Sequence, residues 1–243
     1  MSCLSHKIFV INLNTSKDRW KRIKEQLDLQ KLDYERISGI DLREDSRQHL
    51  KKRYNPKKNR KKYHKSLSIG EIGCYLSHIK CWKKILSDKI DFAVIIEDDV
   101  KLLKNLNEIL LTLYNQSFPN WDYIKIGEKP IKRKTRVVKG LNDFRLIKYL
   151  KKPPTGSYGQ IVSKTGAKKL LDNSKTIFRP VDVDIQYVWE NKLILYGIKP
   201  YCVDPIKTQS DISDMDSKKN HRSRPLIRLL NSIKENWHQI IQV

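Results

Sequence analysis

The chain has 243 residues, of which 39% are hydrophobic, enough to build one α/β domain around a substantial core. Lys and Arg outnumber Asp and Glu by 50 to 27, and the net charge of +23 favours polyanions such as nucleic acid, anionic lipid or nucleotide phosphates. No apolar run approaches the ~20 residues of a membrane span, and the four cysteines show no zinc-binding spacing. These features exclude a membrane-spanning protein and a structural zinc domain, and a reducing cytosol is the expected compartment.

The N-terminal segment predicts a β-α-β unit. Its first strand is Ile8–Ile11, a continuous apolar run of the kind found in strands buried on both faces. A helix is expected to begin near Ser16, because the next apolar residues recur at helical spacing. The second predicted strand is Tyr34–Ile37, which ends at Gly39.

The middle of the chain combines a basic segment with the clearest helix and strand. Lys51–Lys65 holds nine Lys and Arg residues without apolar periodicity, which predicts a solvated loop. Ser68 and Glu71 match a capping box, so a helix is expected to begin there. Phe92–Ile96 predicts a buried strand, and three carboxylates follow it at once.

The remaining elements continue this alternation. The pattern predicts a helix over 103–113, a strand over 121–127, a loop over 129–139, a turn over 153–159 before a strand, a helix over 165–171, a helix from about 180 to 189, and a strand over 193–198. Alternating strands and helices predict a Rossmann-like, mostly parallel sheet flanked by helices, with ligands beyond the carboxyl ends of its strands. By this rule, the loop after Ile11 and the carboxylates after Ile96 are the two places where a ligand is expected to bind.

The last segment differs from the rest of the chain. Its apolar residues recur at helical spacing beside basic ones, which predicts a basic amphipathic helix. The apolar positions are Leu226, Leu229, Leu230, Ile233, Trp237, Ile240 and Ile241. We therefore divide the chain into a domain over 1–215 and a basic tail over 216–243. The tail either binds an anionic membrane surface, the preferred interpretation, or packs on the domain.

Glu97, Asp98 and Asp99 form an acidic edge at the end of the central strand. Adjacent carboxylates repel one another, and Mn²⁺ or Mg²⁺, which prefer oxygen ligands, would compensate them. Because side chains alternate along an extended chain, Glu97 and Asp99 are predicted to hold the metal while Asp98 points the other way. The alternative interpretation is a charged turn where a strand meets solvent.

A metal bridging two phosphates would make a nucleoside diphosphate a leaving group, and transfer to a hydroxyl then needs a base. Asp182 and Asp184, which follow Pro180 at a helix start, are the candidates. Their alternative role is capping of that helix, which Asp commonly performs. Spacing alone does not choose between the two roles.

Three stretches of the chain form a distinctive set: Ile8–Trp20 with Ile37–Asp41, Ser68–Val100, and Pro154–Leu171 with Pro180–Gln186. The middle one is the most specific, since Gly-Glu-Ile-Gly-Cys and Leu-Ser-His precede the acidic triplet. Together they resemble glycosyltransferase family 25, which includes bacterial lipooligosaccharide galactosyltransferases and collagen galactosyltransferases.

The resemblance implies a GT-A fold and an inverting transfer of a hexose, with galactose expected, from a UDP-sugar to a lipooligosaccharide or lipopolysaccharide acceptor. It puts the motif for Mn²⁺ or Mg²⁺ at Glu97, Asp98 and Asp99, with Asp184 or Asp182 as the base. The residues that it places around the donor and acceptor are Asn12, Leu13, Arg19, Gly39, Glu71, Ser77, His78, Asp98, Gly156, Tyr158 and Gly159. Taken alone, His78 would be interpreted as a packed or a surface histidine, and Gly156 and Tyr158 as parts of a tight turn.

One position departs from the GT-A pattern. Many GT-A enzymes supply a late histidine to the metal, and the matching region, 206–211, contains none. Gln209 is the candidate that replaces it in the substrate site, with Asp211 or water as alternatives.

Two other functions compete with glycosyl transfer. A nucleic-acid-binding protein would use Lys51–Lys65, where tyrosines interrupt the basic run, and an inactive relative of the family would only bind. The acidic edge has no role in nucleic-acid binding, so glycosyl transfer is preferred and nucleic acid is not an expected partner. The expected location is cytoplasmic, peripheral on the inner face of the bacterial inner membrane, because the acceptor would be lipid-linked.

Overall fold

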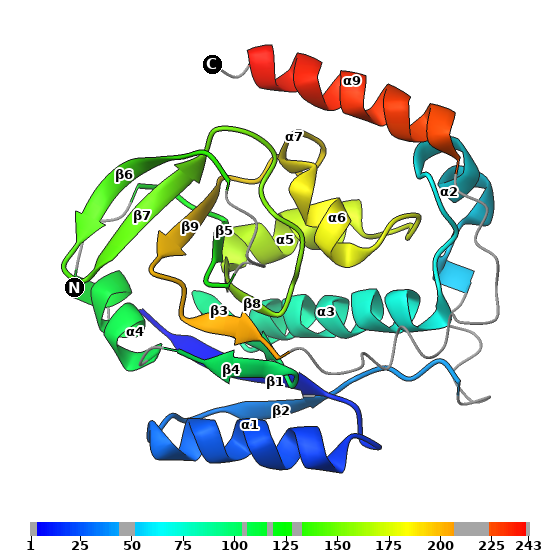
Figure 1. Ribbon diagram of the computed structural model, residues 1–243. Helices are drawn as coiled ribbons and strands as arrows, with labels where there is room; N and C mark the ends of the chain where they lie inside the picture. The colour runs from blue at the N-terminus through cyan, green and yellow to red at the C-terminus, as the bar shows by residue number, and fades with distance from the viewer. Residues whose placement is uncertain are drawn as a thin grey trace.

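A computed structural model describes residues 4–43, 52–103, 106–115, 119–127, 133–206 and 224–241. They form an α/β fold around one eight-stranded sheet (Figure 1). The strands of this sheet are β1 (His6–Asn12), β2 (Glu35–Ser38), β3 (Phe92–Glu97), β5 (Tyr123–Lys125), β6 (Thr135–Leu141), β7 (Phe144–Tyr149), β8 (Gly159–Ser163) and β9 (Leu195–Lys199). Their order across the sheet is β2-β1-β3-β8-β5-β9-β7-β6, and β4 (Val100–Leu102) pairs separately with β10 (Val203–Pro205).

Helices cover both faces of the sheet. Residues of α1 (Lys17–Leu29) and α4 (Leu106–Asn115) share one buried cluster with the strands. Residues of α3 (Ile69–Ser87), α5 (Lys164–Asn173) and α6 (Val181–Gln186) share the other. The described helices further include α2 (Pro56–Lys62), α7 (Val188–Asn191) and α9 (Pro225–Ile241).

The first strand shows why its sequence is apolar throughout. Ile8 and Val10 point into the cluster beneath α1 and α4, whereas Phe9 points into the cluster beneath α3. A strand covered on both faces needs apolar residues at successive positions, so the predicted β-α-β opening is confirmed: β1 and β2 pair in parallel around α1. The capping box is confirmed as well, with Ser68 Oγ accepting from Glu71 N at 3.0 Å and Glu71 Oε2 from Ser68 N at 2.8 Å.

The prediction of a mostly parallel sheet is wrong, because the sheet is mixed. β1 pairs in parallel with β2 and β3, and β5 with β9, but the pairs β3–β8, β5–β8, β7–β9 and β6–β7 are antiparallel. The antiparallel strands have two causes. β8 follows a long loop rather than a crossover helix, and β6 and β7 form a hairpin. A tight turn closes that hairpin, with Asn142 at a φ of 52°.

Two basic segments predicted as loops are partly regular structure. The run Lys51–Lys65 contains α2, which begins because Asn55 Oδ1 accepts from Lys58 N at 2.8 Å and Pro56 occupies the first turn. The run over 129–139 contains the start of β6. Cation-rich composition does not exclude regular structure, because Lys and Arg are good helix formers and β6 leaves most of its side chains exposed.

Strand direction places the acidic edge where four strand ends meet. The carboxyl ends of β1, β2 and β3 share one edge of the sheet because the three strands are parallel. β8 runs the opposite way, so its first residue, Gly159, lies beside Ile96. The backbone N–H of Glu97 donates to Tyr158 O at 3.0 Å, joining the end of β3 to the approach of β8.

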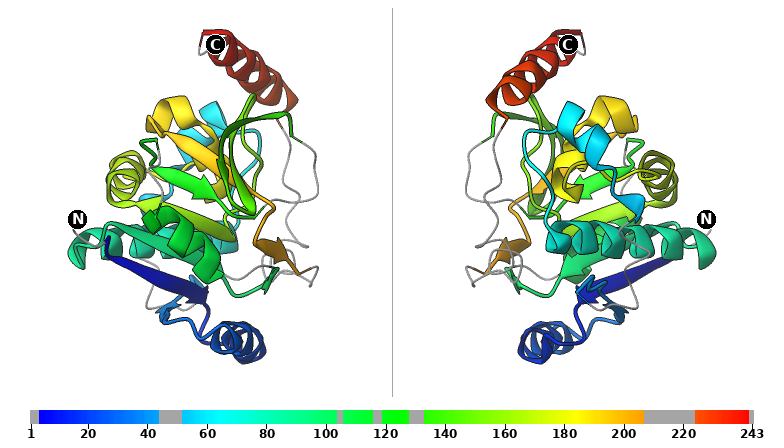
Figure 2. Two further views of the ribbon diagram at one scale, coloured as in Figure 1. Left: turned by 90° about the vertical axis from the view of Figure 1, so that its left-hand side faces the viewer. Right: turned by 90° about the vertical axis from the view of Figure 1, so that its right-hand side faces the viewer.

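The basic C-terminal helix lies at the end of the molecule opposite α1 (Figure 2). α9 begins beside α2 and leaves most of its length away from the sheet. Within the described residues, no helix combines the length and the hydropathy needed to cross a membrane. The predicted boundary between 215 and 216 lies outside the described residues and stays a prediction.

Candidate active site

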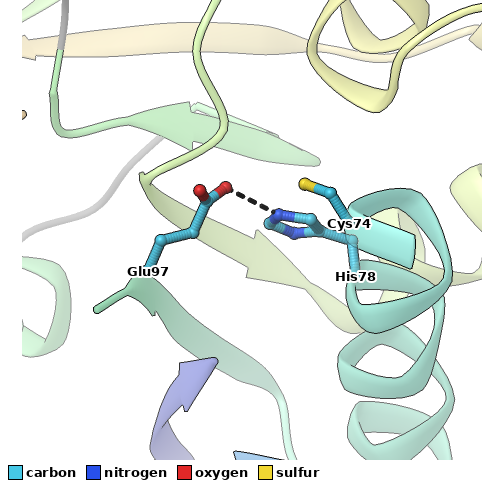
Figure 3. A group of neighbouring side chains, drawn as sticks. All are labelled: Cys74, His78 and Glu97. Atoms are coloured by element: carbon cyan, nitrogen blue, oxygen red, sulfur yellow. Dashed lines mark hydrogen bonds and ion pairs between the residues drawn. The ribbon is translucent and has the colours of Figure 1, made fainter. Parts of the chain in front are cut away.

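The acidic edge presents its three carboxylates in different environments. Glu97 Oε1 accepts from Ser157 Oγ at 2.7 Å and lies 3.0 Å from His78 Nε2, whose ring projects from α3 toward it (Figure 3). Asp98 is held on the other side, where its Oδ2 accepts from Asn12 Nδ2 at 2.6 Å. Asp99 Oδ1 is buried and has no hydrogen-bond partner in the part of the chain that the structure describes.

A closed ring of hydrogen bonds fixes the orientation of Glu97. The amide nitrogen of Gln160 donates to Ser157 O at 2.8 Å and lies 3.1 Å from His78 Nδ1. Because Ser157 O can only accept, this end of the amide is the NH₂ group, and His78 Nδ1 must then be the unprotonated nitrogen. His78 therefore carries its proton on Nε2 and donates it to Glu97. His78 and Gln160 are both fully buried.

Burial and neighbouring charges separate the pKa values of the carboxylates. Burial alone would raise the pKa of Glu97, but the hydrogen bonds from His78 and Ser157 bring it below its ordinary value. Burial raises the pKa of Asp98, and Arg19 and Asn12 oppose that shift. Burial, with the charges of Glu97 and Asp98, raises the pKa of Asp99 to about 7. A cation beside Asp99 would remove this conflict.

The residues present fit a hard divalent cation. Two donors engage Glu97 Oε1, and the unpartnered Oδ1 of Asp99 is buried at the same edge. Carboxylate oxygens are the ligands that Mn²⁺ and Mg²⁺ prefer. Within the described residues, ligand atoms of Cys74, His78 and Glu97 also converge, all within 4.8 Å of one another. That trio is a poor cation site, because His78 turns a protonated nitrogen toward Glu97 and burial raises the pKa of the Cys74 thiol well above its usual range.

A cavity of about 110 Å³ opens onto the acidic edge. Its lining includes seven residues predicted for the site, namely Leu13, Arg19, Ser77, His78, Glu97, Asp98 and Asp99. Ile40, Leu42 and Ile69 form an apolar wall beside them, and Asp41 adds a further carboxylate. The cavity thus combines an apolar wall with an acidic edge.

Three other predicted residues take part in hydrogen bonds within the fold. Asn12 is buried, and its Oδ1 accepts from Arg36 Nε at 3.0 Å while its amide holds Asp98. Gly39 N donates to Asn12 O at 2.8 Å. Glu71 is engaged in the capping box, with Lys65 Nζ 3.7 Å from its Oε1. None of these three lines the cavity.

The loop before β8 holds the predicted Gly156, Tyr158 and Gly159. Gly156 has a φ of 96°, where a side chain would be strained, and an added Cβ would lie 2.5 Å from the Tyr158 ring. Its backbone N–H donates to Asp182 Oδ2 at 3.0 Å. The loop therefore links the acidic edge to the start of α6. Gln209 lies outside the described residues.

The two candidate bases have different surroundings. Asp184 is buried, and its carboxylate accepts from Arg179 Nε and from the Tyr75 hydroxyl. Asp182 is partly exposed, and its carboxylate accepts from two backbone N–H groups and from no side chain among the described residues; the donors are Gly156 N and Val183 N, the latter at 2.8 Å. As placed, Asp184 joins α3 to α6, whereas Asp182 is open to a ligand.

Several residues at the site were missed from the sequence. Ser157 and Gln160 complete the ring around Glu97, and buried Lys125 donates to Gly156 O and lowers the pKa of Glu97 by its charge. Arg179 lies 3.8 Å from the centroid of the Tyr187 ring. The sequence held one usable indication of these residues: a lysine inside an otherwise apolar strand at position 125.

Curated relatives match most of this chain. A procollagen galactosyltransferase 1-A from Xenopus laevis is 27% identical over 186 residues, which cover 73% of this chain and 30% of the relative. A putative glycosyltransferase from Haemophilus influenzae is 31% identical over 179 residues, covering 73% of this chain and 60% of the relative. The chain thus spans less than two thirds of the length of these relatives.

Similarity to solved structures is weaker. A glycosyltransferase involved in glycosylation of the major capsid of PBCV-1 has a TM-score of 0.45 and 10% identity, with 87% of this chain and 97% of that one covered. Such a likeness is too weak to assign a fold or a role. The family comparison is decisive, because the model described as "Glycosyltransferase family 25 (LPS biosynthesis protein)" matches residues 5–185. The chain belongs to glycosyltransferase family 25.

Proposed function

We propose that this glycosyltransferase has a GT-A-type fold and transfers a hexose, with galactose the first candidate, from a UDP-sugar to a lipooligosaccharide or lipopolysaccharide acceptor. The product would carry a β-linkage, and the acceptor would be lipid-linked at the inner face of the bacterial inner membrane. The observation that supports the proposal best is the buried acidic edge, with its unpartnered Asp99 oxygen, at the carboxyl ends of parallel strands. The family description and the galactosyltransferases among its relatives support the choice of reaction and sugar.

Glu97 and Asp99 would hold the metal. Mn²⁺ or Mg²⁺, when bound, would offset the negative charge that gathers on the departing UDP. His78 and Ser157 keep Glu97 ionised and oriented by donating to one of its oxygens, which leaves the other available. Arg19, 3.4 Å from Asp98 Oδ1 and on the cavity wall, supplies a fixed positive charge beside the site proposed for the diphosphate.

Asp182 is the base that we propose for the acceptor. The acceptor hydroxyl attacks the anomeric carbon opposite UDP, the bond from that carbon to the phosphate oxygen breaks, and Asp182 takes the hydroxyl proton. Inversion at an α-linked donor gives the β-product. Backbone N–H groups of Gly156 and Val183 hold the carboxylate in position. Asp184 instead pairs with Arg179 and accepts from the Tyr75 hydroxyl, which ties α6 to α3.

The variant Asp99→Ala tests this proposal, because it should lose both donor and metal binding. UDP with Mn²⁺ should raise the melting temperature of the wild type and leave that of the variant unchanged, and turnover should fall by about 100-fold or more because several kcal/mol of charge stabilisation is lost. Differential scanning fluorimetry and a UDP-release assay across UDP-sugars measure these effects. Asp143→Asn, an exposed carboxylate in the β6–β7 turn, is the matched control.

The control should respond to UDP and Mn²⁺ like the wild type. If the wild type shows no response to any UDP-sugar, the proposed function is wrong. If it instead binds RNA with a steep salt dependence, the nucleic-acid hypothesis replaces it.

A further inference from the structure

The C-terminal helix α9 turns its apolar side away from the protein. Leu226, Leu229, Leu230 and Ile233 are 68%, 58%, 50% and 56% exposed, although they recur at the spacing of one helical face. Ile227 and Asn231, on a different side of the helix, are the half-buried positions. As far as its side chains are described, to residue 233, the amphipathic helix thus contacts the domain by one edge and leaves its apolar stripe uncovered.

The start of α9 is attached firmly to α2. Arg224 donates to Tyr63 O at 2.8 Å and to Asn59 O and Oδ1, each at 3.1 Å, and its backbone N–H donates to His64 O at 2.8 Å. Asn59 is itself fully buried, so this contact reaches the interior of the basic segment. Farther along α9, Asn231 Nδ2 donates to Lys62 O at 2.9 Å. These contacts hold the two helices as one unit.

The outer side of α2 is strongly cationic. Lys57, Arg60, Lys61 and Lys62 are exposed, and none of them has an acidic partner among the described residues. Lys58 differs from them, since it lies 4.3 Å from the centroid of the Phe178 ring. Cations without internal partners therefore flank an uncovered apolar stripe, at the end of the molecule remote from α1 (Figure 2).

We propose that α2 and α9 together form a docking surface for an anionic lipid bilayer. Apolar residues of an interfacial helix enter the boundary between headgroups and acyl chains, and neighbouring Lys and Arg are attracted to anionic headgroups. A second protein copy would need to offer acidic groups against α2, whereas the chain carries a net charge of +23. This inference goes beyond the transfer reaction and does not depend on it.

Vesicle co-sedimentation tests the docking surface directly. The wild type should sediment with vesicles of phosphatidylcholine and phosphatidylglycerol at physiological salt, and not with phosphatidylcholine alone. The triple variant Lys57→Gln, Arg60→Gln, Lys61→Gln should lower the partition coefficient on the order of a hundredfold, since each cation contributes several-fold. Replacing Leu226, Leu230 and Ile233 by Gln, a good helix former, should abolish sedimentation while circular dichroism keeps its helix signal.

A charge-matched variant separates docking from general polycation binding. The triple variant Lys17→Gln, Lys21→Gln, Arg22→Gln removes the same charge from exposed positions of α1, which lies at the other end of the molecule from α9 (Figure 1). It should bind vesicles like the wild type, and so should Asp99→Ala, whatever its activity. Equal loss in the α1 variant, or no loss in the α2 variant, would overturn the proposal. The proposal would also be overturned if analytical ultracentrifugation showed a wild-type dimer that the α9 variant cannot form, while that variant still binds vesicles like the wild type.

Discussion

Gln160 illustrates how one buried amide can determine the behaviour of a carboxylate that it does not contact. Its NH₂ group faces Ser157 O and His78 Nδ1, which leaves the proton of His78 on the nitrogen that faces Glu97. Without this amide, His78 could adopt either tautomer, including the one that turns the lone pair of Nε2 toward Glu97. Gln160 is therefore a positioning residue for the proposed metal ligand.

We predict that Gln160→Leu raises the Mn²⁺ concentration needed for half-maximal turnover by 10- to 100-fold, the usual effect of losing an outer-shell partner. Long-range ¹H–¹⁵N spectra should show an unprotonated Nδ1 for His78 in the wild type and a mixture of tautomers in the variant, with His78→Gln identifying the resonance. A variant that loses activity only in proportion to its unfolded fraction, with the His78 tautomer unchanged, would assign Gln160 a purely structural role.

At this scale the sequence predicts residues that lie next to a strand boundary. Glu97, Asp98 and Asp99 are recognisable because an apolar strand stops at them, and His78 because its motif precedes them. Ser157 and Gln160 are not recognisable, because their distance from Glu97 depends on β8 running antiparallel to β3. The different surroundings of Asp182 and Asp184 depend on Arg179 and Tyr75, which no spacing rule connects.

Among the elements, α5 depends on the absence of a side chain at its first turn. Gly166 lies so close to the start of β5 that an added Cβ would be 2.0 Å from Asp122 O. Gly166→Ala should therefore destabilise the fold by about 1–3 kcal/mol, the usual cost of overpacking. Gly140→Ala on β6, where the added Cβ meets nothing within 4 Å, should be close to neutral. Urea unfolding of both variants measures the difference, and equal stabilities would refute the close approach.

Elements with a strong apolar pattern were predictable, the basic helix α9 among them, whereas cationic elements without such a pattern were not. β1, α1, β2, α3 and β3 follow the expected order because each buries a periodic apolar face. α2 has little such face, and its stability comes from the Asn55 cap and from Arg224, which is remote in sequence. The β6–β7 hairpin was missed because its outer residues are cationic or exposed.

Stability of the whole molecule in acid should depend on Asp88, which joins the first strand to the end of α3. Hydrogen bonds from Lys7, at 2.8 Å, and from Lys84 lower its pKa from 3.8 to about 2. A depressed folded-state pKa means that the stabilisation is complete above about pH 4 and is lost as pH falls toward 2. Asp88→Asn should therefore have a lower melting temperature at pH 6 and converge with the wild type near pH 2. A difference in melting temperature between the two proteins that stays constant over that pH range would contradict this assignment.

The reversed direction of β8 has a consequence for how the protein is made. Glu97 receives its two donors from positions that are synthesised well before and well after it, His78 and Ser157. A nascent chain that ends before residue 157 can already form β1, α1, β2, α3 and β3, yet it exposes a carboxylate that is only half restrained. The pair of donors that restrains Glu97 is therefore complete only once residue 157 has been added to the growing chain.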